Sequence, residues 1–107
     1  PKIKGDFKVV EDPKEAVKNA NVLYTDTFVS MGEEGEMKKR EKELKKYQLN
    51  SSLVKKANNP IVMHPLPAHR GDEITDDVMD GRNSVVFKQA ENRLHVQKSI
   101  ILELMKK

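Results

Sequence analysis

The sequence predicts an α/β fold, a partial Rossmann-like arrangement of three layers with a mainly parallel sheet of about four strands. Short runs rich in β-branched residues alternate along the chain with segments of helical character, an order typical of parallel strands joined by helices. Three of these runs end in polar loops, and in open α/β sheets ligands bind beyond the carboxyl ends of the strands. We therefore expect one shared crevice where these loops meet.

Four segments are predicted as strands, at residues 7–10, 22–24, 61–63 and 84–88. The third is the clearest, because the apolar run Ile61-Val-Met63 is followed at once by His64, Pro65 and a second proline. Proline has no backbone N–H and cannot continue a ladder of hydrogen bonds, so the strand must end there. The polar loops that follow the second, third and fourth predicted strands begin at Asp26, His64 and Gln89.

Four or five helices are predicted between and after the strands, within residues 12–20, 33–46, 50–57, 75–81 and 94–105. Asp12 before Pro13 is a strong helix start, and Asn50 is a second N-cap signal. The last helix carries a helical-period apolar stripe. This stripe comprises Val96, Ile100, Ile101 and Leu104.

The composition is that of a single small domain with a mixed, solvated surface. Hydrophobic residues make up 36% and charged residues 35% of the 107 residues. Twenty basic residues are interleaved with 17 acidic ones, for a net charge of +3. Because the two signs are mixed along the chain, we expect no nucleic-acid-binding face.

The composition also argues against several other classes of protein. The chain has no cysteine, so it has neither a disulfide framework nor thiolate chemistry. No apolar run approaches the roughly 18 residues needed to cross a membrane, and the first residues lack the apolar segment of a signal peptide. The three histidines lack the spacing of metal ligands. We therefore expect a cytoplasmic protein with no membrane contact, no bound metal and no cofactor.

The loop after the second predicted strand carries groups that could hold an ammonium ion. Asp26 offers a carboxylate, Ser30 offers a hydroxyl, and Gly32 lets the backbone turn where a side chain would clash. The alternative is an ordinary polar loop in which Ser30 caps the following helix. The spacing alone favours this alternative.

His64 and Arg93 are further candidates for a functional site. His64 at a strand end could donate a hydrogen bond to an oxyanion, and Arg93 near the start of the last helix could clamp a phosphate. The alternatives are a hydrogen-bonded structural histidine and a surface arginine paired with Glu91. The pattern favours the structural histidine and leaves both interpretations of Arg93 open.

Five motifs occur in one order and at one spacing along the chain. They are Tyr24-Thr-Asp-Thr-Phe-Val-Ser-Met-Gly32, Tyr47-Gln-Leu-Asn50, Met63-His-Pro-Leu-Pro-Ala-His-Arg-Gly71, Asn83-Ser-Val-Val-Phe87 and Gln89-Ala-Glu-Asn-Arg-Leu-His95. With these motifs the chain resembles the ornithine carbamoyltransferases. The resemblance covers essentially the whole chain, and it identifies residues 1–107 as the later part of the family's ornithine-binding domain.

The resemblance implies a reaction and an acceptor site. The neutral δ-amine of ornithine attacks the carbamoyl carbon of carbamoyl phosphate, phosphate leaves, and citrulline forms. Asp26, Ser30 and Met31 match the family loop that closes over ornithine and grips its amino-acid end. These three residues are therefore the expected ornithine-binding residues.

The resemblance also implies a set of catalytic and carbamoyl phosphate-binding residues. His64 and Pro65 match the first two positions of the family's His-Cys-Leu-Pro motif, whose second and third residues contact the substrates; here the third is Leu66. Arg93 matches the arginine that binds an oxygen of carbamoyl phosphate. His64 and Pro65 are thus the expected catalytic positions, and Pro65, Leu66 and Arg93 the expected carbamoyl phosphate contacts.

The sequence departs from the family pattern in two respects. Pro65 stands where the family has cysteine, and proline cannot replace the polar contacts of a thiol. His-Pro-Leu-Pro is the spelling of aspartate carbamoyltransferase, whereas Ser30-Met-Gly32 and Ala68-His-Arg-Gly71 follow the ornithine enzyme, so ornithine is the preferred acceptor.

The second departure is that the carbamoyl phosphate domain and its phosphate loop are absent. The family site needs that amino-terminal domain and a neighbouring subunit of a homotrimer, so we expect the chain to be inactive alone. The alternative function is a non-enzymatic α/β module that self-associates or binds an amino acid weakly.

Overall fold

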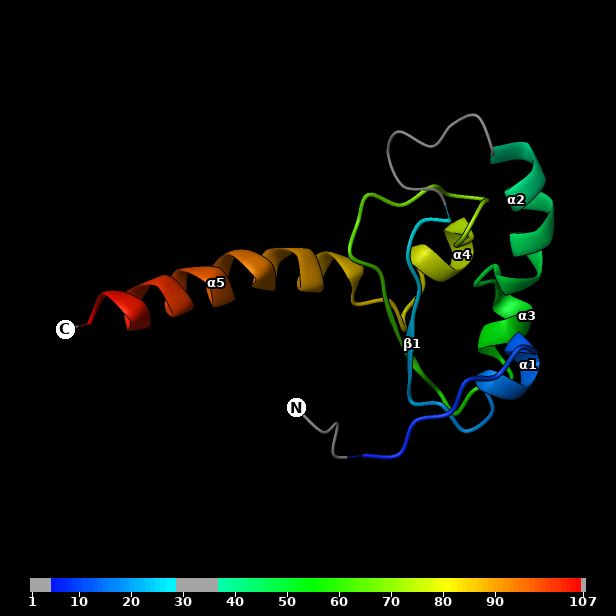
Figure 1. Ribbon diagram of the computed structural model, residues 1–107, viewed down its shortest axis with the longest axis horizontal. Helices are drawn as coiled ribbons and strands as arrows, with labels where there is room; N and C mark the ends of the chain where they lie inside the picture. The colour runs from blue at the N-terminus through cyan, green and yellow to red at the C-terminus, as the bar shows by residue number, and fades with distance from the viewer. Residues whose placement is uncertain (1–4, 29–36, 107) are drawn as a thin grey trace.

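Two short parallel strands, β1 (Val22–Tyr24) and β2 (Ile61–Met63), form the sheet in the computed structural model, which describes residues 5–28 and 37–106. Val22 lies opposite Ile61, and Tyr24 lies opposite Met63. Both strands occur where the sequence predicts them, and their parallel pairing confirms the α/β class. Segment 25–60 connects them and contains α3, one of the helices that cover one face of the sheet (Figure 1).

The predicted fourth strand, residues 84–88, is wrong beyond its first residue. Ser84 makes a single parallel bridge to Val62, with hydrogen bonds from Val62 N to Asn83 O (2.9 Å) and from Val85 N to Val62 O (3.0 Å). The chain then turns directly into a helix at Val86. An apolar run of this length fits a strand or a helix equally well, and here the helix prevails.

The predicted first strand, residues 7–10, is also absent from the structure. This segment pairs with no strand, and Phe7 and Val9 are 80% and 89% exposed. β-Branched and aromatic residues favour a strand only where a neighbouring strand and a buried face receive them. Among the described residues the sheet therefore has two strands and one additional bridge, not the four predicted strands.

Short helices follow the predicted caps closely. They are α1 (Pro13–Ala16), α2 (Met37–Leu44), the 3-10 helix η2 (Lys45–Tyr47), α3 (Ser51–Val54) and α4 (Asp76–Met79). Asp12 Oδ1 accepts a hydrogen bond from Lys14 N at 2.9 Å, and Asn50 Oδ1 accepts one from Leu53 N at 3.0 Å. Both N-cap predictions are confirmed; residues 33–36 of the predicted second helix lie outside the described residues.

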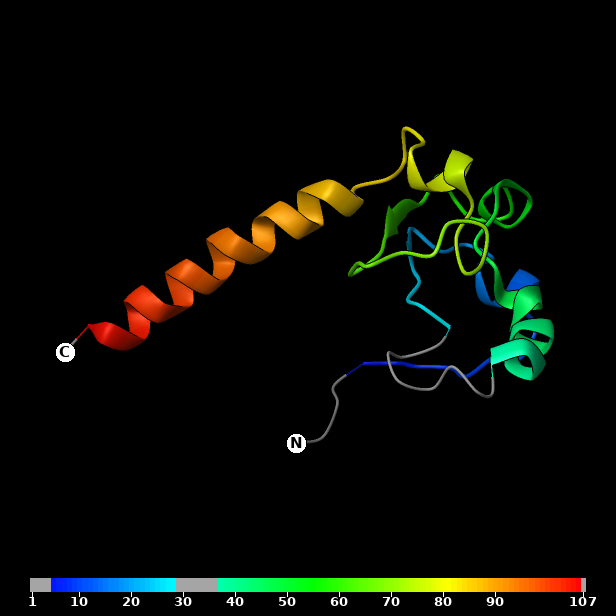
Figure 2. The ribbon, with the colours of Figure 1, turned by 90° about the horizontal axis from the view of Figure 1, so that it is seen from above.

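The apolar core lies between the sheet and α1, α3 and α4, which Figures 1 and 2 place on one side of the strands. Its buried members are Val17, Leu23, Leu49, Leu53, Val62, Ile74, Val78, Met79 and Val86. Val22, Tyr24 and Ile61 point to the opposite face, and all three are exposed. The predicted third layer is therefore not formed by the described residues.

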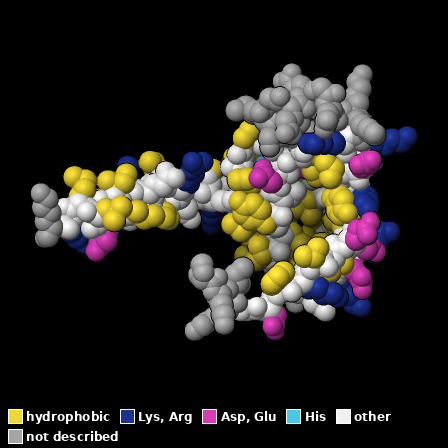
Figure 3. Space-filling view, viewed as in Figure 1, with side chains coloured by type: hydrophobic (Ala, Val, Ile, Leu, Met, Phe, Trp, Pro, Cys, Tyr) yellow, Lys and Arg dark blue, Asp and Glu magenta, His cyan; other side chains and the backbone are white. Residues whose placement is uncertain are grey.

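The last helix, α5 (Val86–Met105), projects away from the rest of the molecule (Figures 1 and 2). It begins eight residues earlier than the predicted helix, and Val86 is its one buried residue. Figure 3 shows apolar side chains along the projecting helix and on the visible side of the rest of the molecule. The predicted apolar stripe exists, but no described residue covers it.

An ion-pair cluster attaches the loop after β2 to α4. Arg70 Nη1 lies 2.6 Å from Asp80 Oδ2 and 2.7 Å from Asp76 Oδ1. The hydrogen bond and charge of Arg70 hold the pKa of Asp80 below its usual range. Because the pKa is lower in the folded state, this pair favours folding above the unfolded-state pKa of about 3.9, and its contribution disappears as the pH falls through the folded-state pKa.

Replacing Arg70 by glutamine should therefore weaken the acid sensitivity of the fold. We expect the urea midpoint of Arg70→Gln to fall less steeply than that of the unsubstituted chain between pH 4 and pH 2. The exposed Lys56 supplies a control, since Lys56→Gln removes the same kind of charge without touching Asp80. Parallel acid profiles for Arg70→Gln and the unsubstituted chain would show that the cluster contributes nothing.

Candidate functional site

The loops that follow β1 and β2 meet at the carboxyl edge of the sheet, as the sequence predicts. Thr25 N donates to Met63 O at 3.2 Å, which continues the strand pairing by one residue. Beyond it, Thr27 Oγ1 and His69 Nδ1 lie 3.0 Å apart. These contacts bring Asp26, which is predicted to bind ornithine, to the same edge of the sheet as His64.

His64 is fully buried, and its hydrogen-bonding groups are occupied. Leu66 N donates to Nδ1 at 2.9 Å, so Nδ1 is an acceptor and the proton sits on Nε2. Nε2 then donates to Glu73 Oε1 at 2.9 Å. The ring thus has a structural role in shaping the loop after β2, in line with the structural alternative; a catalytic role for His64 stays a prediction.

Glu73 is the buried residue that the sequence analysis missed. Its Oε1 accepts from His64 Nε2 and also from His69 N, at 2.6 Å, while its Oε2 is buried without a hydrogen-bond partner among the described residues. Buried carboxylates are rare and are normally paired, so this residue organises the whole loop. In the sequence, the one indication of burial is that Glu73 directly precedes the apolar residue Ile74.

Gln89 links α5 to both strand ends. Its Oε1 accepts from His64 N at 3.1 Å, and its Nε2 donates to the hydroxyl of Tyr24 at 3.2 Å. The predicted polar loop that begins at Gln89 is instead the first part of α5. The sequence predicted the position of this segment but not its helical conformation. The contacts of Gln89 place the start of α5 over the carboxyl edge of the sheet.

Arg93 lies one helical turn beyond Gln89 on α5, not at the start of the helix. Residues four apart share a helix face, so Arg93 is on the face that Gln89 turns toward the strand ends. Its side chain is exposed and makes no ion pair with the described residues. Glu91 faces His95 at 3.5 Å instead, so the alternative of a Glu91–Arg93 pair does not hold, and Arg93 has no carboxylate partner among the described residues.

The remaining predicted contacts fall in two groups. Pro65 and Leu66 are half-buried in the turn after β2, where Leu66 has a φ of 59° and its bond to Pro67 is cis. Ser30 and Met31 lie outside the described residues. Asp26, His64, Pro65, Leu66 and Arg93 are thus carried by elements that converge on one edge of the sheet.

Comparison with known proteins decides the family. The model of the aspartate/ornithine carbamoyltransferase Asp/Orn binding domain matches residues 2–104. The chain belongs to the aspartate/ornithine carbamoyltransferase family. It is 55% identical over 103 residues to ornithine carbamoyltransferase from Methanosarcina mazei and 52% identical over 102 residues to the anabolic enzyme from Pyrococcus furiosus.

Solved carbamoyltransferase structures share the fold. Ornithine carbamoyltransferase from Pyrococcus furiosus matches 91% of this chain with a TM-score of 0.84 and 53% identity, although the match covers 31% of that protein. The enzyme from Thermus thermophilus matches with a TM-score of 0.78 and 40% identity, over 91% of this chain and 31% of its own. The matches to the Methanosarcina and Pyrococcus sequences cover 95% and 94% of this chain but 34% and 32% of those proteins. The chain thus spans about a third of the carbamoyltransferases it matches.

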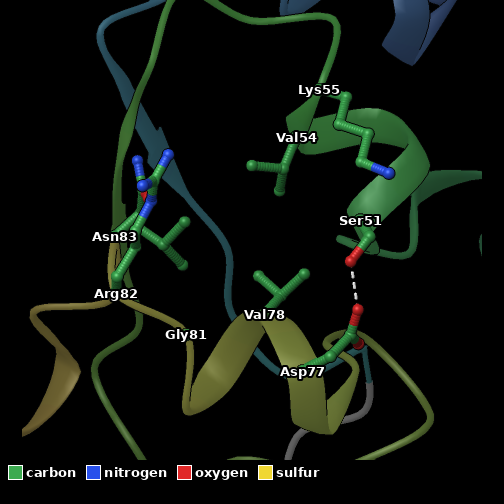
Figure 4. Close-up of a pocket in the computed structure, with 9 residues that line it drawn as sticks. Ser51, Val54, Lys55, Asp77, Val78, Gly81, Arg82 and Asn83 are labelled. Atoms are coloured by element: carbon green, nitrogen blue, oxygen red, sulfur yellow. Dashed lines mark hydrogen bonds between the residues drawn. The ribbon is translucent and has the colours of Figure 1, made fainter.

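A cavity of 270 Å³ lies away from the carboxyl edge of the sheet (Figure 4). α3 and α4 form two of its walls, and Val54 and Val78 point into it from these helices. A Ser51 Oγ–Asp77 hydrogen bond joins the same helices and holds the pKa of Asp77 below its usual range. None of the described residues that are predicted to contact ornithine or carbamoyl phosphate lines this cavity.

The described residues form neither a metal site nor a membrane-spanning helix. Histidine and acidic side chains do not gather in groups of three or more that could hold a metal ion in residues 5–28 and 37–106. Over the same ranges, the helices are too short or too polar to span a bilayer.

Proposed function

We propose that this chain is the later part of the ornithine-binding domain of an ornithine carbamoyltransferase. The complete enzyme transfers the carbamoyl group from carbamoyl phosphate to the δ-amine of ornithine and releases citrulline and phosphate. The observation that carries the proposal is the 55% identity to a protein of that name across 95% of the chain. The convergence of the predicted contact residues on one sheet edge supports it.

Asp26 is proposed to bind an ammonium group of the acceptor amino acid. It is exposed at the carboxyl end of β1, and its Oδ1 accepts from Thr27 N at 2.7 Å, which leaves the rest of the carboxylate open. A carboxylate held by the backbone in this way is a preorganised partner for a cation. Ser30 and Met31 complete the proposed acceptor contacts.

Arg93 is proposed to bind carbamoyl phosphate, together with Pro65 and Leu66. Its guanidinium is exposed on the helix face that Gln89 turns toward the strand ends, and it has no carboxylate partner among the described residues. A fixed cation beside the carbamoyl oxygen stabilises the negative charge that develops as the amine attacks. The buried His64 ring would hold the Pro65–Leu66 turn in place.

The 107-residue chain alone is expected to form no citrulline from carbamoyl phosphate and ornithine. It spans about a third of its relatives, and the proposed site needs the carbamoyl phosphate domain and a neighbouring subunit of a homotrimer. Grafting should supply what is missing: Methanosarcina mazei ornithine carbamoyltransferase with its matched segment replaced by residues 2–104 should produce citrulline.

A colorimetric citrulline assay on purified chain and graft tests both expectations. Arg93→Gln in the graft should lower turnover by about a hundredfold, since oxyanion donors contribute 10²–10³ in rate. The exposed Arg82 provides the control, and Arg82→Gln should leave turnover unchanged. A folded graft without turnover, or turnover by the chain alone, contradicts the proposal.

Pro65 is the position at which the proposed site differs in residue type from the ornithine enzymes, which have cysteine there. Because proline offers neither a thiol nor an N–H, Pro65→Cys in the graft should raise turnover or lower the KM for ornithine, by roughly two- to tenfold for one restored hydrogen bond. Steady-state kinetics with ornithine and with aspartate provide the measurement. Unchanged constants for both acceptors would count against the assignment of Pro65 to the substrate contacts.

A further inference from the structure

A chain of hydrogen bonds runs from the buried core to the acceptor loop. It starts at the pair of fully buried side chains, His64 and Glu73, which lie 2.9 Å apart. It continues through His69, whose backbone N donates to Glu73 Oε1 at 2.6 Å and whose ring reaches Thr27. It ends at Asp26, which holds the backbone N of Thr27. Asp26 and Thr27, at the start of the loop after β1, are therefore connected to the buried pair.

The side chain of Glu73 also lies near the ring of His69. Its second oxygen, Oε2, is buried without a hydrogen-bond partner and lies 3.8 Å from His69 Nδ1. A carboxylate oxygen near a ring nitrogen favours the tautomer that places the proton on that nitrogen. The geometry thus makes His69 Nδ1 the donor and Thr27 Oγ1 the acceptor in their 3.0 Å contact.

We propose that Glu73 and His69 are positioning residues. They hold Asp26 and Thr27, at the start of the loop after β1, in place for binding of the acceptor amino acid. The latch is defined as Glu73, His69 and Thr27. In this proposal the His69 imidazole and the Glu73 carboxylate do not contact the substrate. They act by holding Thr27, and with it Asp26, in place. This inference rests on the proposed function, because it assigns the residues that position the acceptor contact Asp26.

The kinetic test uses the Methanosarcina graft with three substitutions and a control. Thr27→Val removes the hydroxyl at nearly constant volume, and Glu73→Gln keeps the oxygen that accepts from His64 while replacing Oε2 by an amide nitrogen. Thr27→Ser restores the hydroxyl. Ser52→Ala removes an exposed hydroxyl on α3, outside the latch.

Thr27→Val and Glu73→Gln should raise the KM for ornithine about five- to tenfold, the upper part of the range for one lost hydrogen bond, and leave the KM for carbamoyl phosphate within about twofold. Thr27→Ser should return the KM for ornithine to within about twofold, and Ser52→Ala should not change it. Equal effects on both substrates, or no effect on either, would overturn the latch. An unsubstituted graft without turnover would instead overturn the proposed function.

A second measurement does not depend on activity. Long-range proton–nitrogen NMR spectra of the 107-residue chain report which ring nitrogen of His69 carries the proton. We expect the proton on Nδ1 in the unsubstituted chain and a shift toward Nε2 in Glu73→Gln, which lacks the carboxylate charge near Nδ1. A proton on Nε2 in the unsubstituted chain would overturn the proposed role of Glu73.

Discussion

Replacing Glu73 by alanine should cost the fold about 3–5 kcal/mol, a large share of the 5–15 kcal/mol that stabilises a typical domain. The substitution leaves the buried donor His64 Nε2 and the part-buried donor His69 N without their acceptor, and the loss at a buried donor costs about 1–3 kcal/mol. It also opens a void beside His64 that the surrounding residues cannot fill completely. Urea unfolding followed by circular dichroism measures the change.

Glu91→Ala is the matched control for this experiment. Glu91 also faces a histidine, His95, at 3.5 Å, but both side chains are exposed on α5. Exposed pairs of this kind contribute about 0–1 kcal/mol, so the unfolding free energy should change by no more than that. Equal losses for the two substitutions would mean that the burial of Glu73 does not determine its contribution to stability.

The 107-residue chain should self-associate at micromolar concentration through α5 and the open face of the sheet. Four stripe residues of α5 are 53–80% exposed, namely Val96, Ile100, Ile101 and Leu104. Burying each side chain fully is worth about 1.5–3 kcal/mol, so their combined exposure is comparable to the stability of a whole domain. The free edge of β1 adds unpaired backbone groups that recruit another strand.

Sedimentation velocity across a concentration series measures this association. Placing lysine at both Ile101 and Leu104 should shift the chain toward a 12.2 kDa monomer, because charges cannot be buried in an apolar interface. Lysine at Ser99, on the polar face of the same helix, should leave association unchanged. A sharp, cooperative unsubstituted monomer would show that the apolar stripe needs no partner.

The sequence by itself determined the features that depend on neighbouring residues. The two helix caps formed by Asp12 and Asn50 are correct because a capping side chain bonds to an N–H two or three residues away. The strand at residues 61–63 is correct because the following prolines end any ladder. The ordered motifs also led directly to the carbamoyltransferase family.

Tertiary structure decided the features that depend on distant residues. Segments 7–10 and 84–88 have strand composition, but a strand forms only where a neighbouring strand and a buried face receive it. One of them therefore stays unpaired, and the other enters α5 after a single bridge. Local propensity could not distinguish these two outcomes.

The residues of the candidate site also fall into those that the sequence indicates and those that only the tertiary structure reveals. Asp26, His64 and Arg93 are predicted from their chemistry and from the motifs, whereas the contacts of Glu73 and Gln89 across the fold are visible only in the structure. Glu73 is an ordinary acidic residue until the loop after β2 folds back and buries it against His64. Burial of a charge is a property of the assembled molecule, because no local pattern can remove a side chain from water.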